Sequence, residues 1–238
     1  MSGHSKWSKV KHQKAVTDVV KGQAFTKAAH AIAIAVREGG GITDPNANFR
    51  LRLAIEKARV VNMPKENITR AIERGKGQAS ASLASVQYEA YGPGGVAILI
   101  EAVTDNRLRT VAAIKNLLDR YSATLATPGA VNFLFRSTGL ITVGKDNLSS
   151  DKLMSVALDA GAIDLVEKED VFEIYTQPQE LHAIREKLAE QGIKLDHAAL
   201  IMRPITPLNL ENQRPQIDRL IEALEFLEEV QAIYTNLR

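Results

Sequence analysis

The spacing of apolar residues changes near position 80, and this change restricts the fold more than any other feature of the sequence. Before it, apolar residues recur every three or four positions, as at Phe25, Ala29, Ile32 and Val36. That period is typical of a helix with one buried face. After it, short strand-like runs alternate with helical segments. We therefore expect an all-helical part over residues 1–78, followed by mixed α+β structure.

Glycine and proline mark the expected ends of the helices in the first part. The three glycines at 39–41 end the first long helix, because glycine accepts the left-handed conformation of a helix C-terminus. Asp44 and Pro45 are interpreted as the N-cap and first residue of the next helix. Pro64 opens a third helix, and Gly75 is expected to end it.

The remainder of the chain predicts two α+β parts. Residues 78–85 are small and polar, which indicates a linker. The next expected elements are strands at 86–91 and 96–103, a helix at 106–121 and a strand at 130–135. The chain ends with an expected helix at 215–229 and strand at 230–234. An isolated helix and strand need a partner sheet, so we expect this tail to return to the first α+β part.

The segment 139–203 has the order strand, helix, strand, strand, helix, strand, which is typical of a ferredoxin-like domain. The predicted fold is α+β with three domains. They are a basic helical domain at 1–78, a discontinuous α+β domain at 79–138 and 206–238, and an inserted ferredoxin-like domain at 139–205.

Charge is distributed unevenly along the 238 residues. Residues 1–78 hold 15 basic and 6 acidic residues, a net charge of +9, while residues 79–238 hold 15 and 22, a net charge of −7. One cationic end on an otherwise acidic chain indicates a polyanionic partner for that end. A protein partner for the acidic domains is left open.

Lysines crowd the start of the chain, where Asp18 is the one acidic residue before Glu38. Without nearby carboxylates they are available to phosphates. Trp7 among them is expected to anchor the arm more than to stack on a base. The candidate nucleic-acid-binding residues are Lys6, Lys9, Lys11, Lys14, Lys21, Lys27, Arg50, Arg52 and Arg70. Arg107 and Arg109 are candidates for a second anion contact, with Asp105 beside them as a helix N-cap.

No motif indicates catalysis or a cofactor. The glycines at 92–95 and 75–77 lack the strand-to-helix setting of a phosphate-binding loop. There is no cysteine, and His4 and His12 are too few to hold a metal. The most hydrophobic run, at 96–100, is far shorter than the ~20 residues that span a bilayer. We therefore expect a cytoplasmic, non-enzymatic protein without cofactor, metal or membrane segment.

Several strings resemble the YebC/PmpR family over residues 3 to beyond 230, although Gln13 replaces its usual arginine. They include Gly3-His4-Ser5-Lys6-Trp7, Asn62-Met63-Pro64, Tyr91-Gly92-Pro93-Gly94-Gly95 and Thr104-Asp105-Asn106-Arg107, and together they are highly specific. The resemblance implies three domains, the third inserted into the second. It also implies regulation of gene expression, because bacterial members are described as DNA-binding transcriptional regulators.

The leading functional hypothesis is binding of double-stranded DNA in transcription regulation. The alternative is a ribosome-associated translation factor or activator that binds ribosomal RNA, since a mitochondrial relative is a translational activator. Lysines that contact phosphates serve DNA and RNA alike. The sequence therefore leaves the choice between them open, together with target genes, oligomeric state and any regulating ligand.

Overall fold

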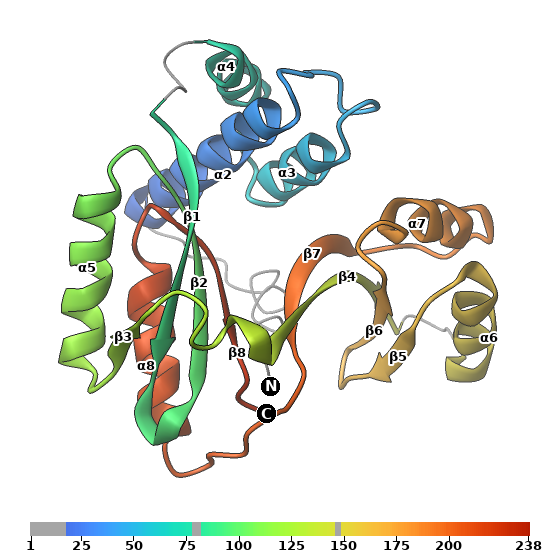
Figure 1. Cartoon of the computed structure of the whole chain (residues 1–238). Helices are drawn as coiled ribbons and strands as arrows, with labels where there is room; N and C mark the ends of the chain where they lie inside the picture. Colours follow the sequence, from blue (N-terminus) through green and yellow to red (C-terminus); the bar gives the residue numbers. More distant parts are fainter. Residues whose placement is uncertain (1–17, 78–81, 146–148) are drawn as a thin grey trace. The chain divides into compact units, whose positions relative to one another are not determined.

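The computed structural model describes residues 18–77, 82–145 and 149–238. In this part of the chain, helices α2, α3 and α4 come first, and two four-stranded sheets with their helices follow (Figure 1). This arrangement confirms the predicted α+β class. Contacts group the chain into two compact units, one of residues 1–134 with 204–238 and one of residues 135–203. The further division into three domains remains a prediction.

The helical part of the first unit is built on α2 (Asp18–Glu38), which packs against α3 (Phe49–Val60) and α4 (Lys65–Lys76). Its core comes from the apolar stripes read in the sequence. Ile32 and Val36 of α2 are fully buried together with Leu51 of α3.

Helix α3 begins later than expected, because Asn48 and not Asp44 is its N-cap. The Oδ1 atom of Asn48 accepts a hydrogen bond from the Leu51 backbone N–H at 3.1 Å, and its Nδ2 atom donates to the Ala35 carbonyl of α2 at 2.9 Å. Asp44 instead accepts from the Asn46 N–H within the preceding turn. Asn48 therefore caps one helix and fastens it to another, which Asp44 does not do.

The first sheet has the order β3-β1-β2-β8, with β1 (Ala84–Tyr91), β2 (Ala97–Thr104), β3 (Thr124–Ala126) and β8 (Val230–Thr235). Strand β8, from the C-terminal tail, pairs antiparallel with β2. Helices α5 (Arg107–Arg120) and α8 (Arg214–Glu225) supply Ile114 and Leu220 to the same core as Ile98 of β2. The C-terminal helix and strand therefore bury their apolar side chains in the core of the first sheet, as expected.

The strand expected at 130–135 is wrong. Residues 132–134 form a short 3₁₀ turn, and β4 starts only at Phe135. Glu89 is the physical reason, because its buried carboxylate accepts hydrogen bonds from the N–H groups of Gly129, Val131 and Asn132 at 2.6, 2.6 and 2.9 Å. Backbone groups that bind a carboxylate in this way cannot join a strand ladder.

The linker interpretation is wrong for residues 82–85. Leu83 is buried with Ala33 and Ile34 of α2 and with Val103 of β2. β1 already begins at Ala84, and the Ser85 hydroxyl donates to Glu38 Oε1 at 2.7 Å. Helix α2 is therefore packed on the first sheet in this unit.

The second unit has the predicted ferredoxin-like order. Its elements are β4 (Phe135–Gly144), α6 (Ser150–Ala160), β5 (Asp164–Glu167), β6 (Val171–Thr176), α7 (Leu181–Glu190) and β7 (His197–Pro204). The sheet order is β5-β6-β4-β7, with antiparallel β4–β6 and β5–β6 pairs. Gly161 ends α6 at φ 107°, as its position after the last apolar residue indicated.

Candidate nucleic-acid interface

The predicted lysines of the leading arm fall mostly outside the described residues. Lys6, Lys9, Lys11 and Lys14 precede residue 18, where the structural description begins. Lys21 lies in the first turn of α2 and is exposed. The hypothesis that the arm contacts phosphates therefore stays a prediction, with Lys21 as its first described member.

Lys27 faces the interior of the first unit. Its Nζ atom donates to the backbone carbonyl of Glu225 at the end of α8. Burial of the ammonium, which outweighs the attraction of Glu225, lowers the pKa of Lys27 to about 8. We therefore leave Lys27 out of the interface.

Arg50 and Arg52 hold the turn that precedes α3. Arg50 Nη1 lies 2.8 Å from Glu38 Oε2 at the end of α2, although the Arg50 side chain is 63% exposed. Arg52 Nε donates to the Pro45 carbonyl at 3.0 Å. Both arginines thus have a structural task at the surface, which makes them weaker candidates than their exposure suggests.

Helix α4 presents cations to solvent. Ile68, Ala71 and Gly75 form its buried side, so Arg70 and Arg74, one turn apart, lie together on the other side. Arg70 donates a hydrogen bond to Asn67 Oδ1 on the same helix, and its side chain remains exposed to solvent. The exposed side of α4 also carries Lys65, Glu66, Thr69, Glu73 and Lys76.

Three exposed cations here were missed by sequence reasoning. Lys65 and Arg70 line a shallow hollow with Glu66 and Thr69. The three missed cations are Arg59 near the end of α3, Lys65 and Arg74. Their side chains make no hydrogen bond or ion pair with any described residue. Their positions outside the apolar stripes of α3 and α4 were a readable signal, because the helix surface that the stripes leave free faces solvent.

The two arginines near the end of β2 differ from each other. Arg109 Nη2 lies 2.7 Å from Asp105 and 3.5 Å from Glu229, so its charge is balanced. Arg107 is exposed and has no ion pair among the described residues. The cap expected at Asp105 is wrong, because Asn106 Oδ1 accepts from the Arg109 N–H at 3.0 Å. Arg107 alone remains a candidate for a second anion contact.

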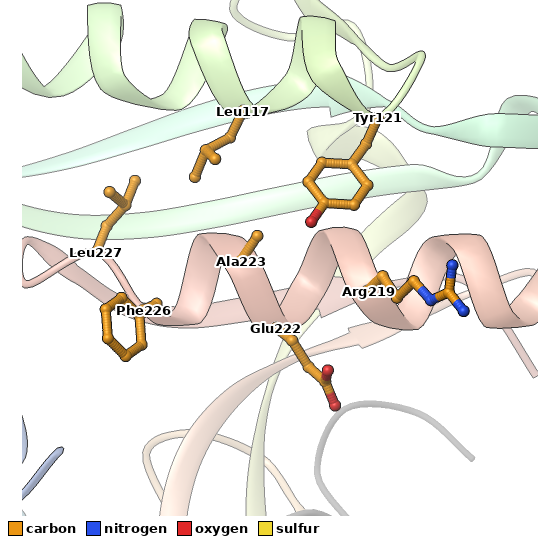
Figure 2. A pocket seen from close by; sticks show the side chains of 7 residues that line it. All are labelled: Leu117, Tyr121, Arg219, Glu222, Ala223, Phe226 and Leu227. Carbon is orange, nitrogen blue, oxygen red and sulfur yellow. The ribbon is translucent and has the colours of Figure 1, made fainter.

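The groove between α5 and α8 is apolar (Figure 2). Leu117 of α5 and Tyr121, which directly follows this helix, face Ala223 of α8, while Arg219 and Glu222 extend from α8 at the rim of the groove. No nucleophile lies beside a base there. Among the described residues no group of three His, Asp or Glu side chains could hold a metal. None of the helices at 18–77, 82–145 or 149–238 is both long and apolar enough to cross a bilayer.

Fold and site together define a class of protein in which a cationic helical part precedes two β-sheets, each packed with its own helices. Family models match almost the whole chain. The model described as TACO1/YebC protein N-terminal domain covers residues 5–78, and the one described as TACO1/YebC second and third domain covers residues 83–237. The chain belongs to the TACO1/YebC family.

Individual relatives agree over the full length. A probable transcriptional regulatory protein of Sulfurihydrogenibium sp. is 45% identical over 99% of this chain and 95% of its own length. One of Chloroflexus aggregans is 47% identical over 100% and 95%. The crystal structure of a conserved hypothetical protein from Aquifex aeolicus superposes with a TM-score of 0.85 at 37% identity, covering 98% of this chain and 97% of that one.

Proposed function

We propose that this protein is a non-enzymatic, nucleic-acid-binding regulator of gene expression, acting on double-stranded DNA in transcription. The observation that carries the proposal is the net charge of +9 on residues 1–78 together with the exposed cations of α4. Such a surface attracts a polyanion at one end of the chain only. The printed names of the relatives, probable transcriptional regulatory proteins, support transcription as the process.

The binding surface in this proposal joins the arm to α4. Lys6, Lys9, Lys11, Lys14 and Lys21 contact phosphates from the arm, while Arg70 and Arg74 contact them from the helix. Apart from the exposed Arg107, the candidate for a second anion contact, the acidic remainder of the chain stays away from the nucleic acid and offers a surface to protein. The protein acts in the cytoplasm without a cofactor.

One observation keeps ribosomal RNA as the second candidate. The exposed side of α4 carries mainly cations, carboxylates and Thr69. Its one amide side chain, that of Asn67, is half-buried and already accepts a hydrogen bond from Arg70, whereas Asn and Gln that read adenine edges need a free amide. Contacts to the phosphate backbone position a protein without reading sequence. A surface of this kind suits a structured RNA as well as a DNA duplex.

Binding isotherms on duplex DNA and on a ribosomal RNA fragment, at four salt concentrations, test the proposal. The variant Arg70→Gln with Arg74→Gln should bind more weakly, with a salt slope smaller by about 2 on duplex DNA. The matched control is Lys115→Gln with Arg120→Gln, two exposed cations of α5. Equal weakening in the control would show that the charge effect is not located on α4.

Sedimentation separates the two targets. A cell extract in low salt is layered on a sucrose gradient, and the protein is followed by immunoblot. Co-migration with ribosomes that is lost in the α4 variant would replace DNA by ribosomal RNA as the target. Absence from the ribosomal fractions, with tight binding to duplex DNA, is the expected result.

A further inference from the structure

Helix α6 of the second unit carries an unexplained apolar surface. The described residues of this unit expose three large apolar side chains, and all three lie within ten positions of one another. Met154 is 38% exposed, Leu158 52% and Ile163 53%. Exposed apolar side chains that are neighbours in the chain, unlike scattered ones, are typical of an interaction site.

Packing of the unit does not account for this cluster. The core side of α6 is formed by Leu153, Ala157 and Ala160. Met154 and Leu158 are one turn apart and therefore share a different side, and Ile163 follows directly after the turn at Gly161. We name Met154, Leu158 and Ile163 the α6 patch.

Carboxylates flank the α6 patch. Asp151 and Asp159 are exposed, and neither makes an ion pair with another described residue. The helical positions of both place them on the solvent side of α6 next to Leu158. Lys152 is the one basic residue in the helix. Residues 135–203 as a whole hold 8 basic and 12 acidic residues, a net charge of −4.

We propose that the α6 patch is a docking surface for a basic, amphipathic segment of a partner protein. Apolar side chains of the segment cover Met154, Leu158 and Ile163, and its Lys or Arg residues meet Asp151 and Asp159. Charge complementarity selects this occupant, because the flanking carboxylates repel nucleic acid and a second acidic copy of this unit alike. Methionine suits such a surface, since its flexible side chain adapts to different partners.

This inference rests on the proposed role of the acidic part as a protein contact. It adds which surface is used and what chemistry the partner brings. Nucleic-acid binding by residues 1–78 is separate from it, so the two proposals can fail independently.

Photo-crosslinking in living cells tests the proposal. The photoreactive residue p-benzoylphenylalanine replaces Ser155, which is exposed beside the α6 patch, in the full-length chain. The control position is Ala183, exposed on α7 of the same unit. We expect position 155, and not 183, to crosslink a protein at a segment rich in Lys or Arg and in apolar residues.

Two surface variants make the result specific. With the crosslinker at 155, Met154→Ser with Leu158→Ser removes the apolar contact, and Asp151→Lys with Asp159→Lys reverses the flanking charge. Both should reduce crosslinking to the level of position 183. All four side chains are exposed, so the variants should fold, which a thermal melt checks.

Several outcomes overturn the proposal. They are crosslinks to nucleic acid or to another copy of the chain, no crosslink at all, and a crosslink that survives charge reversal. Binding of duplex DNA is measured on the same variants. Loss of crosslinking with unchanged DNA binding supports the docking surface, whereas a wild type that binds no nucleic acid counts against the proposed function alone.

Discussion

Gly75 of α4 lies so close to Val36 of α2 that no side chain fits between them. A methyl group built on Gly75 falls 2.7 Å from Val36 Cβ and 2.8 Å from the carbonyl oxygen of Ala33. Glycine in a helix costs about 1 kcal/mol relative to alanine. The close approach of two helices explains why it stands here.

Replacing Gly75 with alanine should therefore destabilise the protein, although alanine is the better helix former. The new methyl group meets backbone and a branched side chain, so we expect a net loss of about 1–3 kcal/mol in the free energy of unfolding. Gly22→Ala is the matched control, because Gly22 lies in α2 with open space around it. That change should stabilise by about 0.5–1 kcal/mol. Urea unfolding of both variants checks the prediction, and equal effects would contradict it.

The same residue shows where sequence reasoning succeeds and where it stops. The apolar periods predicted the helices and the ferredoxin-like order, because burial of one face is a local pattern. A glycine near a helix end is ambiguous, since a C-cap and a close helix contact need the same residue. Gly75 was read as a helix end, yet α4 runs to Lys76. Only the position of α2 distinguishes the two.

Tertiary partners also explain the other differences. Asp44 and Asn48 are both good caps by composition, and the Ala35 carbonyl on α2 favours Asn48. Among the predicted cations, Lys27 looked free because its partner, the Glu225 carbonyl, lies 198 residues away. Composition gives the net charge of residues 1–78, but it does not say which of their cations turn inward.

Glu89 should be essential to the turn at residues 129–132. Although burial alone would raise the pKa of Glu89, three backbone N–H bonds lower it below its ordinary value. Glu89→Gln replaces one acceptor oxygen with a donor, so a backbone N–H loses its partner. We expect a loss of about 1–3 kcal/mol in the free energy of unfolding at pH 7.

Acid should remove this difference between wild type and the Glu89→Gln variant. A carboxyl with a depressed folded pKa stabilises above its unfolded pKa, and the contribution disappears as pH falls through the folded value. Denaturant unfolding at pH 7, 5 and 3 measures the difference. A constant gap across this series would mean that the charge of Glu89 does not hold the turn.

Lys27 should make the protein more stable in mild alkali. Its pKa is about 8 in the folded chain, against an ordinary value of 10.5, because burial disfavours the ammonium. The folded state thus releases its proton first, and stability rises with pH between about 8 and 10.5, by up to about 3 kcal/mol from this group. Lys27→Met should reduce that rise, and what is left belongs to Lys57, because burial lowers the pKa of that lysine as well. Lys21→Met, exposed in the same helix, is the control. A similar rise in the Lys27→Met variant would assign the effect to another group.

Lys9, Lys11 and Lys14 give the most direct test of the arm. No acid precedes Asp18, so nothing in the local sequence neutralises them. Replacing all three with glutamine removes charge and keeps length. If each contacts one phosphate, the slope of log affinity against log salt on duplex DNA should fall by about 2 to 3, since each contact contributes about 0.9. Folding stability should hardly change, because no acid in the neighbouring sequence can form an ion pair with these lysines.

Isotherms at four or more salt concentrations, with a thermal melt as control, measure this change. Combining the arm variant with Arg70→Gln and Arg74→Gln then shows whether the arm and α4 meet the same duplex. Separate contacts should give additive losses of slope, because counterions are released phosphate by phosphate. An unchanged slope in a folded arm variant would leave these lysines as a solvated surface, and α4 would then carry the electrostatic contact alone.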